Sequence, residues 1–155
     1  MENFSNSEEY LLEVKLRSLN PTVGFGNALS MANDGSIPAM YCIARFFETA
    51  FGTVQDNSNA LNWYEIAAKA GSLPAKIYLA DCLVSGRLGN MDIEKSFLLN
   101  QEAANLGDAS SALSVAICYL NGRGVQINIE QSKFWLDRAI KLGSKEAAAM
   151  KGLVP

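Results

Sequence analysis

The chain has 155 residues, of which 49% are hydrophobic and 19% charged, and its formal net charge is −3. This is the size and composition of one ordinary domain with enough apolar side chains to bury a core. The balance of 13 basic and 16 acidic residues argues against a nucleic acid or an anionic membrane as a partner. The sequence contains no histidine, which excludes Ser-His-Asp and Cys-His catalytic pairs as well as histidine metal sites.

The cysteine pattern predicts the compartment. Cys42, Cys82 and Cys118 are far apart and form no Cys-x-x-Cys pair, so we expect neither a disulfide framework nor a zinc ribbon, but reduced thiols in a cytoplasm.

The N-terminus has no basic segment followed by an apolar run, and no later stretch approaches the roughly 20 apolar residues of a membrane span. The expected location is therefore cytoplasmic, without a membrane anchor.

The first predicted element is a helix from Ser7 to Leu19, which we expect Pro21 to end because proline breaks a helix. The chain then reaches the first of four glycines that follow one another at a constant interval of 36 residues. These glycines are Gly35, Gly71, Gly107 and Gly143. Such a period is the mark of a repeat protein. Residues 1–34 are accordingly expected to be N-terminal capping helices.

The spacing of apolar residues in each 36-residue unit predicts two helices. Its apolar positions recur at intervals of three and four residues, which is the spacing of one helix face. Asp56, Asp92 and Asn128 occupy one position in successive units and are expected to cap the second helix. The resulting repeats are 35–70, 71–106 and 107–142, and residues 143–155 form a C-terminal capping helix in what we expect to be a single domain.

The repeat resembles a known family. Residues Gly107 to Gly143 follow the pattern Gly-x3-Ser-x4-Ala-x2-Tyr and then Gly-x-Gly-Val-x2-Asn-x3-Ser-x2-Trp-Leu-x2-Ala-x3-Gly, which is similar to the Sel1-like repeat, a relative of the tetratricopeptide repeat. Ala50 replaces a loop glycine in the first copy, and Leu99-Asn100 replaces the aromatic pair in the second. The resemblance implies an all-α fold, a right-handed α-solenoid of antiparallel helix hairpins.

A second stripe on the first helix of each repeat is the predicted partner-binding surface. It lies beside the face that packs inside the repeat, and the family's architecture would turn it toward the concave side. It changes from polar to apolar along the chain. Its residues are Tyr41, Arg45, Glu48, Ile77, Asp81, Val84, Leu113, Ile117 and Leu120. Two interpretations remain open for its apolar end: the C-terminal helix covers it through Ala149 and Met150, or it forms an open groove for a partner's side chains.

No catalytic constellation can be assembled from the sequence. Cys82 and Cys118 occupy equivalent positions and are expected to be packing residues, and the loops after Gly86 and Gly122 are turns rather than phosphate loops. We therefore expect a non-enzymatic module without cofactor or metal that binds a protein or peptide, as a monomer or weak homo-oligomer. The resemblance to small bacterial members implies one version, an immunity protein that inhibits a toxin. The alternatives are an adaptor or scaffold and an enzyme or saccharide binder.

Overall fold

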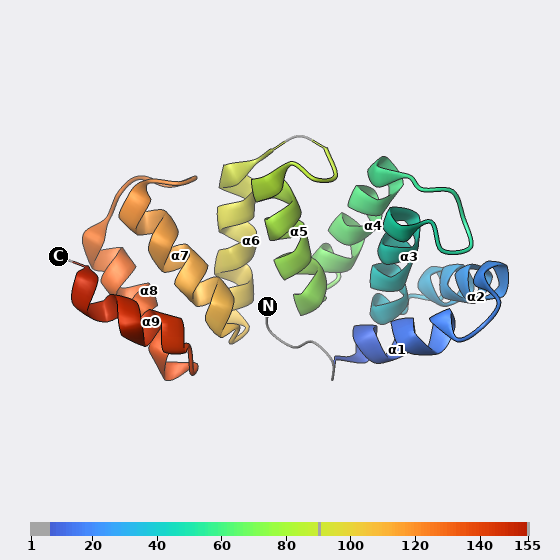
Figure 1. The fold of residues 1–155 in the computed structure, drawn as a ribbon, viewed down its shortest axis with the longest axis horizontal. Coiled ribbons are helices and arrows are strands. Elements are labelled where there is room, and N and C mark those ends of the chain that lie inside the picture. The colour runs from blue at the N-terminus through green and yellow to red at the C-terminus, as the bar shows by residue number, and fades with distance from the viewer. Residues whose placement is uncertain (1–6, 90, 155) are drawn as a thin grey trace. The chain divides into compact units, whose positions relative to one another are not determined.

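The computed structural model describes residues 7–89 and 91–154, and this part of the chain is α-helical without strands (Figure 1). Its helices are α1 (Glu8–Arg17), α2 (Pro21–Asn33), α3 (Ile37–Thr49), α4 (Asn57–Lys69), α5 (Leu73–Ser85), α6 (Ile93–Asn105), α7 (Ala109–Asn121), α8 (Ile129–Lys141) and α9 (Lys145–Met150), followed by a short 3-10 helix, Lys151–Leu153. No helix within the described residues is long and apolar enough to cross a membrane.

The helices keep the period of the sequence. The starting residues of α3, α5, α7 and α9 are Ile37, Leu73, Ala109 and Lys145, and those of α2, α4, α6 and α8 are Pro21, Asn57, Ile93 and Ile129. Both series advance by 36 residues, so α2 holds the register of a second repeat helix. Helix α1 ends at Arg17, before Pro21 as expected, and Pro21 is also the first residue of α2, which was not predicted. Proline fits there because the first N–H groups of a helix have no partner within it.

Side-chain caps begin the second helices as the sequence predicts. The backbone N–H groups of Asn59, Lys95 and Gln131 each donate a 2.9 Å hydrogen bond to the side-chain oxygen of the residue three positions earlier. These acceptors are Asp56, Asp92 and Asn128. Each cap satisfies one of the N–H groups that a helix leaves unpaired at its start.

The period glycines end these helices in a left-handed conformation. Their φ angles are 91° at Gly35, 107° at Gly71, 98° at Gly107 and 100° at Gly143. At each of these ends the N–H of the residue after the glycine bonds to a carbonyl five residues back, as from Ser72 to Ala67 at 3.0 Å. This is the Schellman arrangement, and glycine adopts it without the strain that a Cβ would add.

The described residues form two compact units, which we treat separately. Unit 1 consists of residues 7–79 and 87–89, and unit 2 of residues 80–86 and 91–154. The division falls within α5, so the first part of this helix belongs to unit 1 and the second part to unit 2.

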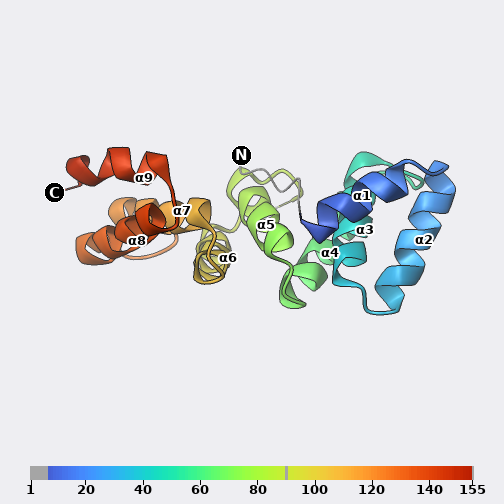
Figure 2. The same ribbon diagram turned by 90° about the horizontal axis from the view of Figure 1, so that it is seen from below.

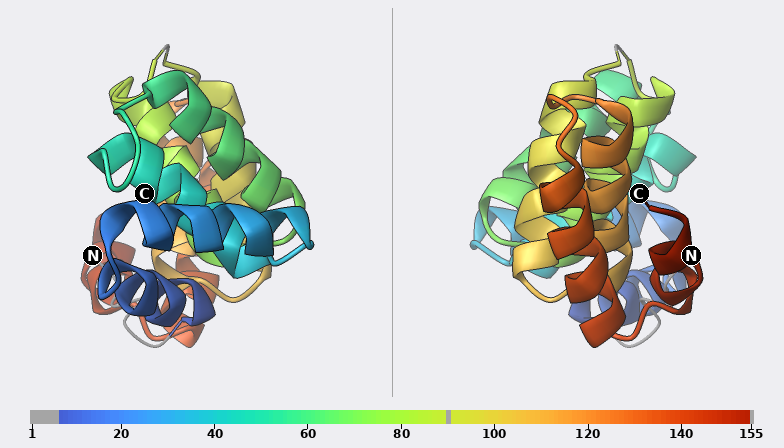
Figure 3. Two further views of the ribbon diagram at one scale, coloured as in Figure 1. Left: turned by 90° about the vertical axis from the view of Figure 1, so that its right-hand side faces the viewer. Right: turned by 90° about the vertical axis from the view of Figure 1, so that its left-hand side faces the viewer.

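In unit 1, helices α1, α2 and α4 pack around α3, and α1 and α2 stand in front in Figure 3, left. A continuous apolar cluster joins α1, α2 and α3. Its buried members are Leu16, Ala28, Ala32, Ala39, Cys42, Ile43 and Phe46. Both members on α2, Ala28 and Ala32, and two members on α3, Ala39 and Cys42, are small, and small side chains let helix backbones approach closely.

In unit 2, helix α7 packs between α6 and α8, and α9 contacts α8 (Figure 2). The cluster that holds these helices consists of Phe97, Ala104, Ala112, Val115, Ala116, Trp135, Leu136, Ala139 and Ala147. The predicted inner face of the first helix is confirmed here, because Ala112, Val115 and Ala116 are buried and Tyr119 packs against them. Cys82 is also buried, as expected for a packing residue, whereas Cys118 is partly exposed.

Candidate functional site

Helix α3 carries the first part of the predicted stripe. Tyr41, Arg45 and Glu48 lie at positions i, i+4 and i+7, and all three side chains are partly buried. Opposite them Ile43 and Phe46 are fully buried, so the apolar face of the helix fixes the orientation of the polar one. Packing on one side thus presents the other side in a defined direction.

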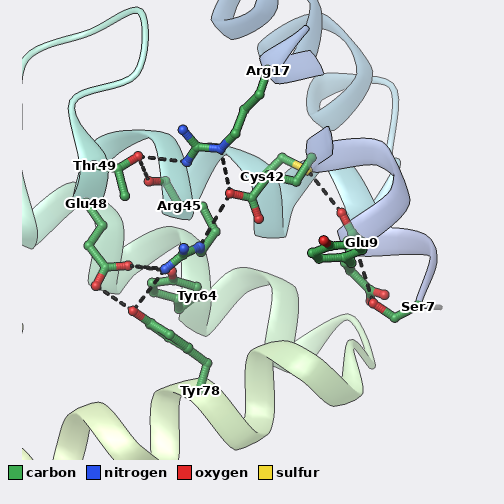
Figure 4. A network of polar contacts seen from close by, with 11 residues as sticks. Ser7, Glu9, Arg17, Cys42, Arg45, Glu48, Thr49, Tyr64 and Tyr78 are labelled. Carbon is green, nitrogen blue, oxygen red and sulfur yellow. Dashed lines mark hydrogen bonds and ion pairs between the residues drawn. The ribbon is translucent and has the colours of Figure 1, made fainter. Parts of the chain in front are cut away.

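The carboxylate of Glu48 is the centre of a polar network (Figure 4). Arg45 Nη1 donates to Glu48 Oε2 at 3.1 Å, and Tyr64 Oη donates to the same oxygen at 2.9 Å. Tyr78 Oη donates to Oε1 in a short hydrogen bond, and Arg87 Nε lies 3.8 Å from that oxygen. Two guanidinium groups and two phenols therefore stabilise one carboxylate that has lost most of its water.

A second carboxylate extends the network onto α1. Glu13 Oε1 accepts a 2.8 Å hydrogen bond from Arg17 Nε and lies 3.6 Å from Arg45 Nε. Arg17 Nη2 also donates to Thr49 Oγ1 at 2.8 Å, and Thr49 Oγ1 donates to the carbonyl of Arg45 at 2.7 Å. These bonds attach α1 to α3 along the edge of the apolar cluster (Figure 4).

Aromatic rings and guanidinium groups alternate beside the carboxylates. The ring of Tyr78 lies 5.4 Å from the guanidinium carbon of Arg45 and 4.8 Å from that of Arg87. Tyr64 stacks on Tyr78 with a centroid separation of 4.6 Å, and Tyr41 meets Tyr64 edge to face at 5.7 Å. Contacts of this kind restrict the rotamers of all five side chains.

Burial keeps the phenols of the network in their proton-donating form. Burial is the main cause that raises the pKa of Tyr41 and Tyr64 above the ordinary range of tyrosine. Burial and the hydrogen bond to Glu48 raise the pKa of Tyr78 to about 12. Burial likewise raises the pKa of the Cys42 thiol to about 12, so this cysteine is not an activated nucleophile at neutral pH.

The arginine side chains of the network are more exposed to solvent than its glutamate side chains. The side chains of Glu13 and Glu48 are 11% and 13% exposed, whereas those of Arg17, Arg45 and Arg87 are 32%, 26% and 50% exposed. Glu9, whose carboxylate accepts a 2.8 Å hydrogen bond from Ser72 Oγ, is a third acidic residue beside the network. The arginines therefore differ from the carboxylates in exposure rather than in number.

The rest of the predicted stripe lies on α5 and α7. In unit 1, Ile77 is partly buried. In unit 2, Asp81 and Val84 are exposed, and Leu113, Ile117 and Leu120 are partly buried. Leu113 and Met150 both pack against the cluster that contains Ala147, whereas Ala149, expected to cover the stripe, is exposed.

Sequence reasoning missed several members of the network. Glu13, Arg17, Tyr78 and Arg87 were not among the predicted site residues. Tyr78 follows Ile77 directly and occupies the position that Cys42 holds one repeat earlier, so a tyrosine in place of a packing cysteine was the available signal. No group of three or more His, Cys, Asp or Glu side chains among the residues that the structure describes could hold a metal ion.

A comparison with models of protein families identifies the family of the chain. A model described as Sel1 repeat matches residues 37–72, 74–108 and 109–144. The chain belongs to the Sel1 repeat family. The predicted resemblance is confirmed, and Sel1 repeats generally serve as protein–protein interaction modules. A search of curated proteins finds no match.

Solved structures confirm the predicted fold class, an all-α solenoid of helix hairpins. A Sel1 repeat protein from Oxalobacter formigenes is similar with a TM-score of 0.84 and 20% identity, over 95% of this chain and 44% of that one. The protein c5321, a protective antigen of uropathogenic Escherichia coli, has a TM-score of 0.72 and 22% identity over 96% and 32% of the two chains. Helicobacter pylori cysteine rich protein B has a TM-score of 0.61 and 15% identity over 94% and 98%. The chain spans less than half of the first two proteins.

Proposed function

We propose that the chain is a non-catalytic Sel1 module whose protein or peptide partner binds to the first helices of the repeats. The observation that carries the proposal is the network on α3 and α5. Arginine and tyrosine are the residue types enriched at binding hot spots, and here Arg45 and Tyr78 are partly exposed yet held by contacts. A surface that is ordered before binding loses little side-chain entropy when a partner arrives.

The charge of the network supports an acidic partner segment. Glu13 and Glu48 already accept hydrogen bonds from within the chain, and the side chains of Arg17, Arg45 and Arg87 are more exposed than theirs. A partner carboxylate that approaches this surface meets guanidinium groups first. Guanidinium groups bind carboxylates in a planar, often bidentate geometry.

In unit 2 the same proposal rests on apolar contacts. Leu113, Ile117 and Leu120 lie on one face of α7 and are partly buried, so each has surface that a partner can cover. Asp81 and Val84 on α5 are exposed. Apolar side chains on the partner gain free energy of roughly 25 cal/mol per Å² of apolar surface removed from water there.

The role of the complex is either inhibition or assembly. An immunity protein that holds a toxin or effector would abolish its partner's activity, whereas an adaptor or scaffold would leave that activity intact. We propose that binding occurs in the cytoplasm, and the absence of a disulfide at Cys42, Cys82 and Cys118 supports this compartment. An assay of the captured partner's activity with and without this chain separates the two roles.

Site-specific photo-crosslinking in the native host tests the proposal. A photoreactive phenylalanine analogue replaces Tyr41 on α3 or Ile117 on α7, and the control carries it at Asn62, an exposed position on α4. We expect the same protein to crosslink at positions 41 and 117 but not at position 62. Crosslinks that are equally frequent at all three positions, or absent at both 41 and 117, would refute the proposed surface.

A further inference from the structure

Helices α6 and α8 of unit 2 expose large apolar side chains at equivalent positions. Leu98 on α6 and Phe134 on α8 are 36 residues apart and are 55% and 56% exposed. Leu106 and Leu142, which follow them by eight residues and cap the ends of the two helices, are exposed too. In the first repeat the corresponding residues are Asn62 and Ala70. The apolar character is therefore specific to these two helices.

These four exposed residues, Leu98, Leu106, Phe134 and Leu142, occupy equivalent positions in two successive repeats, and we call them the outer face of unit 2. Arg138 Nη1 on α8 donates a 2.9 Å hydrogen bond to Asn105 Oδ1, the last residue of α6, so side chains of the two helices meet at this level. In each helix the C-cap leucine follows the exposed apolar residue by eight positions, a little over two turns, and is rotated from it by about 80° around the helix axis.

Phe134 is exposed but contacts a buried residue of the core. Its ring meets that of Trp135 edge to face with a centroid separation of 5.6 Å. Trp135 is buried in the core of unit 2 and is also covered by the guanidinium group of Arg138 at 5.0 Å. An exposed aromatic side chain in contact with a core residue resembles the anchor residues of protein interfaces. Apolar surface of this kind is a mark of association when it is contiguous.

The charges of the two helices are complementary. Helix α6 carries Glu94 and Glu102 against Lys95, a net charge of −1. Helix α8 has the opposite net charge, +1, because its basic residues Lys133, Arg138 and Lys141 exceed its acidic residues Glu130 and Asp137.

An ion pair makes the exposed side of α8 more basic still. Lys151, which follows α9, lies with its Nζ 2.7 Å from Asp137 Oδ1. This contact offsets one of the two acidic charges on α8. Lys141 in the last turn of α8 is exposed, and so is Glu94 in the first turn of α6. An antiparallel approach of α6 to α8 would bring opposite charges together.

We propose that the outer face of unit 2 joins two copies of this chain in a twofold-symmetric dimer, in which α6 of each copy packs on α8 of the other. A twofold interface uses the same surface on both copies. The surface must therefore be complementary to itself. In the proposed dimer, acidic α6 of each copy contacts basic α8 of the other, so the favourable contact forms twice. The apolar residues Leu98 and Phe134 then meet at the centre and are removed from water.

Sedimentation equilibrium of the full chain, from micromolar to submillimolar concentration, gives the first test. We expect a monomer–dimer equilibrium that Phe134→Asp weakens by about thirtyfold or more, as for the loss of an interface anchor. Leu11→Asp is the matched control, because Leu11 on α1 of unit 1 is as exposed as Phe134. Circular dichroism checks that both variants remain folded. A wild-type chain that is monomeric throughout, or a dimer unaffected by Phe134→Asp, would overturn the proposal.

Charge reversal gives a second test that does not remove any apolar residue. One variant carries Glu94→Lys and Glu102→Lys on α6, and the other carries Lys133→Glu and Lys141→Glu on α8. Each variant alone places like charges across the twofold interface and should dimerise at least about tenfold more weakly than wild type. Mixed together, the two variants should form a heterodimer, because both of its helix contacts again join opposite charges. A mixture that associates no better than either variant alone would contradict the pairing of α6 with α8.

Discussion

Tyr64, a fully buried residue of α4, donates a 2.9 Å hydrogen bond from its phenol to Oε2 of Glu48 on α3. The bond connects the two helices of the first repeat at the point where the carboxylate also binds Arg45 and Tyr78. A buried phenol needs such a partner, because an unpaired hydroxyl in the core costs free energy. The candidate binding surface and the packing of the hairpin therefore depend on the same side chain.

The first prediction concerns the stability of this network. Glu48→Ala leaves two phenols and the partly buried Arg45 without their common acceptor, and we expect the free energy of unfolding to fall by about 2–4 kcal/mol. Tyr64→Phe removes one hydrogen bond and should cost about 1 kcal/mol. Urea unfolding measures both changes, and Tyr10→Phe on exposed Tyr10 is the control. If Glu48→Ala costs no more than the control, the network does not stabilise unit 1.

The second prediction concerns alkaline pH. The pKa of Tyr78 is raised from 10.0 to about 12 in the folded chain, so the folded chain holds this proton more tightly than the unfolded chain. The stabilisation is complete below pH 10 and is lost as the pH rises toward about 12. Burial raises the pKa of Tyr41 and Tyr64 in the same direction.

Urea unfolding at a series of alkaline pH values tests whether stability falls as the pH rises. We expect the free energy of unfolding to fall with rising pH, and to fall less steeply in Tyr78→Phe, because one of the contributing phenols is missing. An identical pH dependence in wild type and Tyr78→Phe would show that Tyr78 titrates alike in the folded and unfolded chains.

The third prediction concerns a hydrogen bond repeated inside unit 2. Ser132 Oγ donates to the carbonyl oxygen of Ala116 at 2.8 Å, and Ser96 Oγ donates to that of Ala80 at 2.9 Å. Both hydroxyls are buried and connect the two helices of a hairpin. Ser132→Ala should lower the free energy of unfolding by about 0.5–1.5 kcal/mol. The matched control is Ser110→Ala on the exposed side of α7, and equal thermal denaturation of the two variants would contradict the prediction.

The fourth prediction concerns the loop of the first repeat. Ala50 ends α3 with φ of 55°, a left-handed angle that Gly86 and Gly122 adopt at the corresponding positions with φ of 67° and 69°. The Cβ of alanine costs roughly 1–2 kcal/mol there, and glycine adds entropy to the unfolded chain. Ala50→Gly should therefore stabilise the chain by up to about 1 kcal/mol, seen as a higher melting temperature. A lower melting temperature would show that the loop is not strained at this residue.

Local signals explain why the helices could be predicted from the sequence. Asp56 bonds within its own first turn, and Gly71 ends its own helix. Such short-range contacts recur with the period, so the register of α3 to α9 follows from composition and spacing alone. The start of α2 at Pro21 was not predicted, because proline is suited both to ending one helix and to starting the next.

The polar network could be predicted only in part. Arg45 and Glu48 were found because they share a helix face. Glu13 and Arg17 bind residues 32 positions away, and this pairing depends on how α1 lies against α3, which no local pattern encodes. Arg87 lies in a loop whose sequence specifies a turn but not the direction of its side chain.

Whether the partner binds to the first helices of the repeats is best tested by measuring the affinity of the crosslinked partner for substituted chains. Isothermal titration calorimetry would compare wild type with Tyr41→Ala on α3, Ile117→Asp on α7 and the control Asn62→Asp on α4. We expect each of the first two substitutions to raise Kd about tenfold or more, while the control leaves it unchanged. An unchanged Kd for both Tyr41→Ala and Ile117→Asp, in chains that melt like wild type, would contradict partner binding on the first helices.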